Sequence, residues 1–258
     1  RELAQMLGYE TYADYALSQR MAENTPNVHK LLNDLIDAYM PTALAEVKEV
    51  EDLYYEDNDI DPSTLSESDP RRFMPWDFSF YSNKLKERKF NINSEMLRPY
   101  FQLSKVKEGV FGLATKLYGI TFRKNTDAPV YHPDVDVYDV IDKDGTPLAL
   151  FYCDFHPRAS KKSGAWMTSF KEQWISKEGT NSRPQVSIVM NFSKPTENKP
   201  ALLTLDEVET FLHEFGHSLH GIFANTTYSS LSGTNVYWDF VELPSQFMEN
   251  YSIEKDFL

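Results

Sequence analysis

The pentapeptide His213–His217, which reads H-E-x-x-H, is the feature that most constrains how this chain can fold. Side chains four residues apart lie on the same face of a helix, so both imidazoles can reach one metal ion. Glu214 points to the neighbouring side of that face, where it can reach a water molecule without binding the metal. Two histidine ligands and a carboxylate base on one turn are typical of zinc-dependent hydrolysis, so this pattern predicts a metal site. The alternative is a pair of ordinary histidines with an unrelated glutamate between them.

The residues around this pentapeptide predict the helix that it requires. Thr204 and Glu207 have the spacing of a capping box, in which each side chain bonds the backbone amide of the other residue. The apolar residues that follow recur at helical spacing and would bury one side of the helix: Val208, Phe211, Leu212, Phe215, Leu219 and Ile222. The sequence therefore predicts a helix from about Leu205 to Phe223, with both histidines beside its buried stripe.

A second, acidic helix is predicted to supply a third ligand, because a zinc hydrolase uses three protein ligands and one open position. Residues 239–250 carry a polar stripe at steps of three and four, formed by Asp239, Glu242, Gln246 and Glu249. Apolar residues flank this stripe and predict its burial, which is costly for carboxylates unless they are paired or bind a metal. A solvated acidic face is the alternative. Pro244 lacks a backbone donor, so the helix is expected to start or kink near it.

The segments HEFGHSLH and SGTNVYWDFVELPSQFMEN resemble the catalytic core of the thimet oligopeptidase and peptidyl-dipeptidase (dipeptidyl carboxypeptidase) family of zinc metallopeptidases. The resemblance covers most of the chain, since it includes Trp76-Asp77, Phe101-Gln102-Leu103, residues 148–152 and residues 163–167. The Ser-Gly-Ala-Trp-Met and Leu-Ser-Gly-Thr stretches are closer to the bacterial peptidyl-dipeptidase branch. This resemblance implies a zincin-like catalytic region, in which one helix carries HExxH and a second helix carries the third ligand.

The same resemblance implies a role for the main residues of both helices. His213, His217 and Glu242 would bind one zinc ion per chain, and Glu214 would be the general base. The implied activity is hydrolysis of short peptides, with removal of C-terminal dipeptides as the expected mode. An endo-acting oligopeptidase of the same family is one alternative, and a non-catalytic peptide-binding fragment is the other. The downstream segment with which the family stabilises the oxyanion has no counterpart here, so the chain resembles an internal part of a larger peptidase.

The sequence also predicts roles for four further residues, which lie near the motif or in the expected strands. Glu249 is the first candidate to orient a ligand histidine through its second ring nitrogen, and Asp239 is the second candidate. Capping or solvating their helix is the alternative role for both. His220 is expected to neighbour the site rather than to bind the metal. Cys153, the only cysteine, lies in an apolar run and is expected to be a buried strand residue.

Composition excludes several classes of protein. A hydrophobic fraction of 41% and an aromatic fraction of 14% argue against disorder. No apolar run approaches the roughly 20 residues that span a bilayer, and a net charge of −13 disfavours a nucleic-acid partner. A single cysteine excludes a disulfide framework and favours the cytoplasm, with the periplasm left open. Peptide is the one partner implied, and the sequence does not indicate an oligomeric state.

The predicted fold is mainly α with a small antiparallel β-sheet. Residues 1–258 are expected to form part of one catalytic domain, with a mostly helical region 1–128, a β-rich region 129–200 and metal-binding helices in 201–258. The turn sequence of residues 142–145 lies between two apolar stretches and predicts a β-hairpin. Gly164 and Ala165 would let a substrate backbone approach the sheet, and packing is the alternative role for these small residues.

Overall fold

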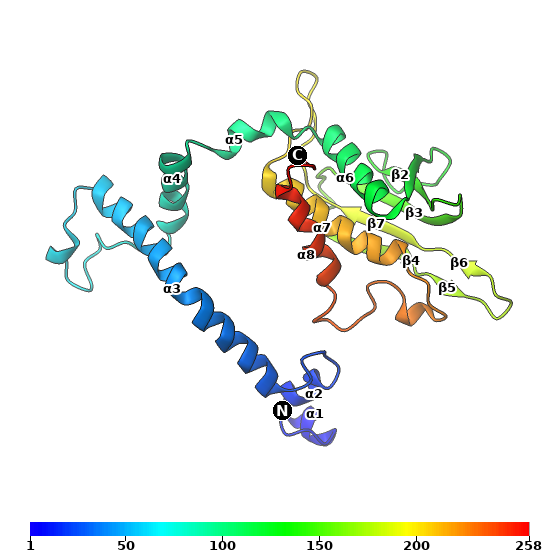
Figure 1. The fold of residues 1–258 in the computed structure, drawn as a ribbon, viewed down its shortest axis with the longest axis horizontal. Coiled ribbons are helices and arrows are strands. Elements are labelled where there is room, and N and C mark those ends of the chain that lie inside the picture. The colour runs from blue at the N-terminus through cyan, green and yellow to red at the C-terminus, as the bar shows by residue number, and fades with distance from the viewer. Residues whose placement is uncertain (258) are drawn as a thin grey trace. The chain divides into compact units, whose positions relative to one another are not determined.

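The computed structural model describes residues 1–257 and has the α+β class that the sequence predicts. Its contacts divide the chain into two compact units on either side of the Met96–Leu97 bond. Figure 1 shows a first unit built from helices and a second unit in which helices pack on a sheet. In the part of the chain that the structure describes, no helix is both long enough and apolar enough to cross a membrane.

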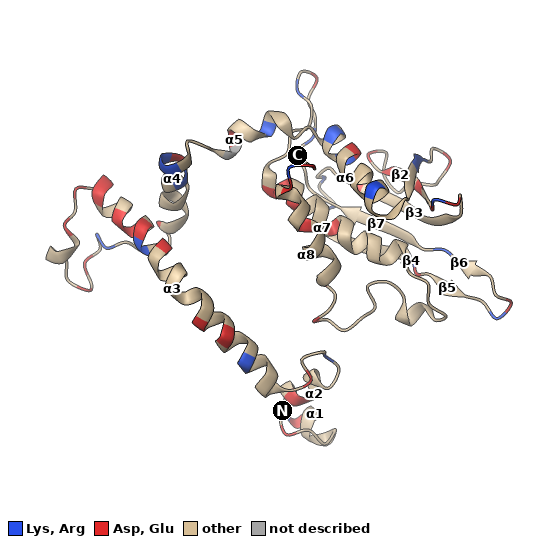
Figure 2. Ribbon diagram, viewed as in Figure 1, with Lys and Arg blue, Asp and Glu red and all other residues tan. Residues whose placement is uncertain are grey.

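Helices account for the first unit, namely α1 (Glu2–Met6), α2 (Tyr12–Leu17), α3 (Thr25–Asp57), the 3-10 turn η1 (Pro62–Thr64) and α4 (Phe78–Phe90), with α5 (Ser94–Leu97) at the boundary. The long helix α3 begins where Asn24 accepts a hydrogen bond from the Asn27 amide at 3.0 Å, with a proline in the first turn. Figure 2 shows acidic residues along α3 and basic residues on α4. Ion pairs such as Arg88–Glu56, at 2.8 Å, therefore join these two helices.

The second unit contains both helices and strands. Its helices are η2 (Arg98–Tyr100), α6 (Leu103–Tyr118), α7 (Leu205–Ile222), η3 (Ser229–Leu231), α8 (Leu243–Glu249) and η4 (Asn250–Ile253). Its strands are β1 (Thr121–Lys124), β2 (Asp136–Ile141), β3 (Pro147–Asp154), β4 (Trp166–Lys171), β5 (Trp174–Ile175), β6 (Asn181–Ser182) and β7 (Gln185–Val189).

The main sheet has five strands in the order β1-β2-β3-β7-β4, and β5 pairs with β6 separately. The predicted hairpin is present, because β2 pairs antiparallel with β3 and the Gly145 amide donates to the Asp142 carbonyl at 2.9 Å. The sheet is mixed rather than antiparallel throughout, since β3 and β7 run parallel. This difference arises because the chain leaves β3, forms the outer strand β4 and then returns to place β7 between them. Such a parallel pair needs a long crossover, which local turn sequences do not reveal.

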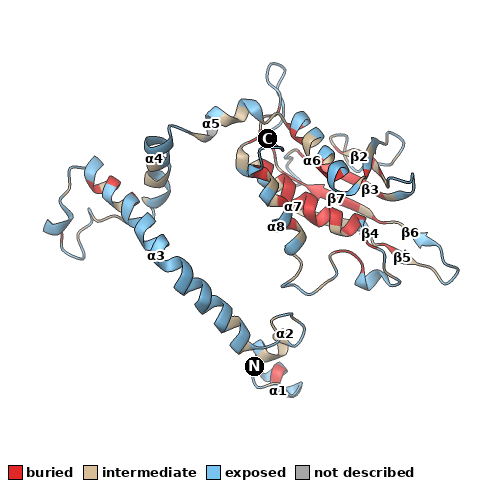
Figure 3. Ribbon diagram, in the orientation of Figure 1, coloured by how far each residue is buried: buried red, intermediate tan, exposed pale blue. Residues whose placement is uncertain are grey.

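Helices α6 and α7 cover one face of this sheet and enclose the core. Four aromatic rings meet there: Phe111 from α6, Phe122 from β1, Phe151 from β3 and Phe215 from α7. Figure 3 shows α7 and β7 as the most continuously buried elements of this unit. Phe151 and Phe215 have no exposed surface, and each such ring contributes about 1.5–3 kcal/mol through burial. The HExxH sequence of α7 thus lies on a helix that is packed into the core.

Candidate metal centre

Helix α7 carries the HExxH sequence, and its start confirms the predicted capping box. The Glu207 amide donates to Thr204 Oγ1 at 3.1 Å, and the Thr204 amide donates to Glu207 Oε2 at 2.8 Å. The helix ends at Ile222, one residue before the predicted end. Because its apolar stripe faces the core, His213 and Glu214 are turned toward the side of the helix that borders a cleft.

Helix α8 is shorter than the stretch that the sequence predicts to be helical. It begins at Leu243, with Pro244 in the first turn, while residues 239–242 form turns in which the Phe240 amide donates to the Tyr237 carbonyl at 2.9 Å. Proline is favoured in the first turn because no hydrogen bond is lost there. The helix start expected near Pro244 is therefore confirmed, and Glu242 lies at the N-cap of α8 rather than inside a helix.

Gly216 allows α8 to approach α7 closely. A Cβ atom built on Gly216 would lie 2.4 Å from the Pro244 carbonyl oxygen and 2.6 Å from the Ser245 Cα. Real side chains do not approach backbone atoms so closely, so only glycine fits at this crossing. This close packing brings Glu242, at the start of α8, next to the two histidines of α7.

Three side chains from these helices converge on one point. Glu242 Oε2 lies 3.3 Å from His213 Nε2 and 3.0 Å from His217 Nε2. One ligand atom from each residue lies within 4.8 Å of the others. Zinc–ligand bonds of about 2.0–2.2 Å in a tetrahedron put neighbouring ligand atoms roughly 3.3 Å apart, which is close to both distances from Glu242 Oε2. The two-imidazole, one-carboxylate set therefore fits zinc in both chemistry and spacing.

Glu249 lies beside His213, as the sequence expects. Glu249 Oε1 is 2.5 Å from His213 Nδ1. A proton on Nδ1 donated to this carboxylate leaves Nε2 with a free electron pair directed at the three-residue cluster. Burial lowers the pKa of His217, so this imidazole also favours the neutral form in which it can bind a metal.

Glu214 is buried on the same turn of α7, with 6% of its surface exposed. Burial is the main cause that raises the pKa of its carboxyl to about 7; the nearby Glu242 acts in the same direction, and His213 and the Met167 backbone amide oppose it. A carboxyl group with a pKa near neutrality can both accept and release a proton at physiological pH. A dication bound beside it would favour the ionised form.

The cluster opens into a cleft of about 640 Å³. One wall is formed by Ala165, Trp166 and Met167 at the start of β4, and the other by Thr234, Trp238 and Val241. Ala165 lines this cleft, and its expected role near a substrate stays a prediction. Gly164 does not line this cleft, although its φ of +91° is a conformation that favours glycine.

The remaining predicted residues are distributed more widely. Asp239 is exposed and does not line the cleft, and Gln246 is exposed as well. The predicted burial of the acidic stripe is therefore wrong, since even the side chain of Glu242 is 50% exposed. The prediction of this stripe assumed one continuous helix. In the structure, residues 239–242 form turns, and Asp239 therefore does not share a helical face with Glu249. His220 lies one turn beyond His217 but lines a separate pocket. Cys153 is fully buried in β3, as expected, and burial raises the pKa of its thiol.

Two residues that support the site were not singled out from the sequence. Ser245 Oγ donates to Glu242 Oε2 at 2.8 Å and so holds the carboxylate that faces the histidines. Arg183 donates to the Ile222 and Ala224 carbonyls at 2.7 and 2.9 Å and thereby fixes the C-terminal end of α7 to the sheet. A serine after proline hints at a helix start, but an isolated arginine before β7 gives no signal of its own.

Comparison with known proteins identifies the group to which this arrangement belongs. The sequence model described as peptidase family M3 matches residues 1–258. The chain belongs to peptidase family M3. Members of this family are metallopeptidases, in agreement with the resemblance and with the His213, His217 and Glu242 cluster.

Several relatives match this M3 chain along almost its whole length. The dipeptidyl carboxypeptidase of Salmonella typhimurium is 40% identical over 96% of the chain, and oligopeptidase A of the same organism is 38% identical over all of it. Saccharolysin of Saccharomyces cerevisiae is 34% identical over 99%. The chain spans only 35% to 36% of the length of these three relatives.

Proposed function

We propose that this protein is a zinc-dependent peptidase that hydrolyses short peptides, and that this chain carries its metal centre. The observation that supports the proposal most directly is the convergence of His213, His217 and Glu242 at one cleft. Glu214 lines the same cleft. A structural metal site would use its ligands fully and would not need a carboxylate base beside them. The position of Glu214 therefore favours catalysis over a purely structural or peptide-binding role.

The proposed chemistry divides between the metal and the chain. A zinc ion in this site supplies Lewis acidity, which lowers the pKa of water to about 7 and polarises a carbonyl. Glu214 takes the proton from the attacking water and returns it to the departing amine. Glu249 holds His213 in the tautomer that directs Nε2 to the cluster, and Ser245 holds Glu242. The walls of the cleft orient the peptide.

We further propose that the protein removes dipeptides from the C-terminus of its substrates, and that it acts in the cytoplasm. An endo-acting oligopeptidase is the alternative, because relatives with either name are almost equally similar to this chain. The cytoplasmic location is supported by the single buried cysteine, which has no partner within the chain for a disulfide. Products of defined peptides, separated by chromatography, would distinguish dipeptide release from internal cleavage.

Metal stoichiometry tests the proposed ligand set. After loading and desalting, we expect about one zinc ion per chain and a large loss of zinc in Glu242→Gln, because a neutral amide is a weak zinc ligand. Glu178→Gln, an exposed residue between β5 and β6, is the matched control and should retain the metal. Equal zinc in the wild type and in Glu242→Gln would reject Glu242 as a ligand.

A further inference from the structure

A second cleft, of about 550 Å³, lies next to the metal centre and has a different character. Its lining includes Trp166, which also lines the metal cleft, so the two clefts are neighbours along β4. Tyr131 and Phe170 form an aromatic wall, with ring centroids 5.7 Å apart. Arg158 and Lys162 line the same cleft and contribute positive charge, and the Arg158 guanidinium lies over the Tyr131 ring at 5.8 Å from its centroid.

This second cleft lies on the face of β4 that is turned away from α7. Met167 points toward α7, since its Cε is 3.0 Å from the position that a Cβ on Gly221 would occupy. Side chains alternate along a strand, so Trp166, Thr168 and Phe170 face the other way. In the described chain β4 pairs only with β7 and forms one edge of the sheet.

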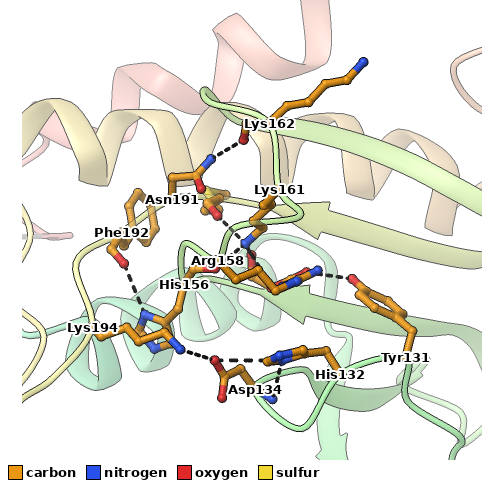
Figure 4. A network of polar contacts seen from close by, with 12 residues as sticks. Tyr131, His132, Asp134, His156, Arg158, Lys161, Lys162, Asn191, Phe192 and Lys194 are labelled. Carbon is orange, nitrogen blue, oxygen red and sulfur yellow. Dashed lines mark hydrogen bonds and ion pairs between the residues drawn. The ribbon is translucent and has the colours of Figure 1, made fainter.

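Cations outnumber anions in this cleft, although the whole chain carries a net charge of −13. Its one carboxylate, Asp154, is fully buried and accepts hydrogen bonds from Arg158 at 2.9 and 2.8 Å and from Lys161 at 2.9 Å. Tyr131 Oη donates to the same carboxylate at 3.0 Å. Figure 4 shows Arg158, Lys161 and Tyr131 grouped in this network, while the ammonium of Lys162 extends away from it. Among the described residues, Lys162 Nζ has no ion-pair partner.

The backbone that carries Lys162 is fixed in place. Asn191 Nδ2 donates to the Lys162 carbonyl at 2.9 Å (Figure 4) and also to the Gly164 carbonyl at 2.7 Å. Lys161 Nζ also donates to the carbonyls of His156 and Met190. The backbone at the rim of the cleft is therefore held by hydrogen bonds from Asn191 and Lys161, and the exposed Lys162 side chain extends from this fixed point.

At the end of the metal cleft near His213, the neighbouring residues are negatively charged. A third cleft shares His213 with the metal cleft and is lined by Asp206, Glu209 and Glu249. The order along this surface is therefore acidic cleft, metal cleft and cationic cleft. An extended peptide with a free N-terminal ammonium and a free C-terminal carboxylate complements this polarity in one orientation only.

We infer that the cationic cleft binds a carboxylate of a peptide that lies along the open edge of β4, with Lys162 as its main charged contact. This inference rests on the proposed peptidase function. A strand added at the edge would direct alternate residues toward the face that carries Trp166 and Phe170. The carboxylate comes from either the C-terminus or an acidic side chain, since the cleft would bind both through the same charge-assisted hydrogen bonds.

Binding of four matched peptides tests this inference. The peptides combine a C-terminal acid or amide with Asp or Asn at one internal position, and their Kd values are measured by fluorescence anisotropy on the full-length protein in its Glu214→Gln form. A carboxylate should improve affinity about tenfold, and the gain should shrink as salt is raised. Lys162→Glu should abolish the gain, whereas Lys177→Glu, an exposed lysine outside the cleft, should preserve it.

The outcomes separate the inference from the proposed function. A gain only for the acid terminus assigns the cleft to the C-terminus, and a gain only for Asp assigns it to a side chain. Equal affinity for all four peptides, or a gain that survives Lys162→Glu, would overturn the inference and leave the peptidase proposal intact. Failure of every peptide to bind would overturn both.

Discussion

Glu214 and Glu249 are both carboxylates beside the same histidine, but their surroundings give them different tasks. Glu214 is buried and forms no ion pair among the described residues, so burial raises its pKa to about 7. Glu249 bonds His213 Nδ1 and is directed away from the cluster of ligand atoms. Replacing each residue by glutamine removes its charge with little change in shape, so the two roles can be separated experimentally.

Glu214→Gln should abolish turnover without removing the metal. Glutamine cannot accept and return a proton, and general acid–base catalysis of this kind is typically worth roughly 10²–10⁴-fold. Peptide hydrolysis by the full-length protein should therefore fall by about this factor in kcat, while zinc content stays near one per chain. Near-normal activity would reject Glu214 as the base, and loss of zinc would show that its role is structural.

Glu249→Gln should weaken zinc binding rather than abolish it. The amide oxygen can still accept from His213 Nδ1, but the loss of negative charge makes the imidazole a poorer ligand, and changes of this kind typically cost about 10–100-fold in metal affinity. Competition with a zinc chelator would measure the change. Glu254→Gln, an exposed residue shortly after α8, is the control and should leave the zinc affinity unaltered.

The candidate metal ligands and Glu249 could be predicted from the sequence because helical spacing and the family pattern together identify them. His213, His217, Glu242 and Glu249 all lie where this reasoning puts them. Asp239 does not, because its predicted position requires a helix that includes residue 239, whereas α8 begins only at Leu243. Arg183 and Ser245 escaped prediction because their partners are backbone carbonyls and a carboxylate, which single positions in a sequence do not specify.

At the scale of elements, the crossing of α7 and α8 determines whether the third ligand reaches the histidines. Gly216→Ala would drive a methyl group into the Pro244 backbone and should destabilise the protein by about 1–3 kcal/mol. Because the strain moves α8 and Glu242 outward, zinc content should fall as well. Unfolding by denaturant and elemental analysis would measure the two effects.

Gly112→Ala in α6 is the matched control for this crossing. A Cβ on Gly112 meets no atom within 4 Å, so alanine should stabilise the helix by about 0.5–1 kcal/mol and leave zinc content unchanged. A Gly216→Ala protein as stable as the wild type and fully loaded with zinc would contradict the close packing described for α7 and α8.

Elements governed by local signals were predicted well, and long-range pairing was not. The capping box of α7 and the β2–β3 hairpin depend on residues a few positions apart. The parallel pairing of β3 with β7 places Leu150 beside Gln185, and the segment between these residues in the sequence contains β4. No local pattern specifies that choice, which explains why the sequence indicated an antiparallel sheet.

At the scale of the whole molecule, the buried Asp154 makes the free energy of unfolding depend on pH in the acidic range. Burial alone would raise the pKa of Asp154, but hydrogen bonds from Arg158, Lys161 and Tyr131 outweigh it and hold the pKa below the usual 3.8. The unfolded chain therefore binds this proton more readily than the folded chain. Its stabilising contribution is present above the unfolded pKa and is lost as pH falls from about 5 through the lower folded pKa.

Asp154→Asn should therefore lower the free energy of unfolding near neutral pH and flatten its fall in acid. Removing one partner of a buried ion pair costs about 3–5 kcal/mol, because Lys161 stays buried beside a neutral side chain. Denaturant unfolding across pH values from about 6 to 3 would give both quantities. Asp127→Asn, in an exposed turn, should change neither, and an unaltered acid slope in Asp154→Asn would contradict the assignment.

The strand order also has a consequence for how the protein is made. Strand β4, whose start lines the metal cleft, leaves the ribosome before β7, yet β7 is the strand that joins it to the rest of the sheet. Pairings between distant parts of a chain form slowly, so β4 has no place in the sheet until β7 has been synthesised and has paired on both sides. A nascent chain therefore carries no finished cleft before β7 has been made.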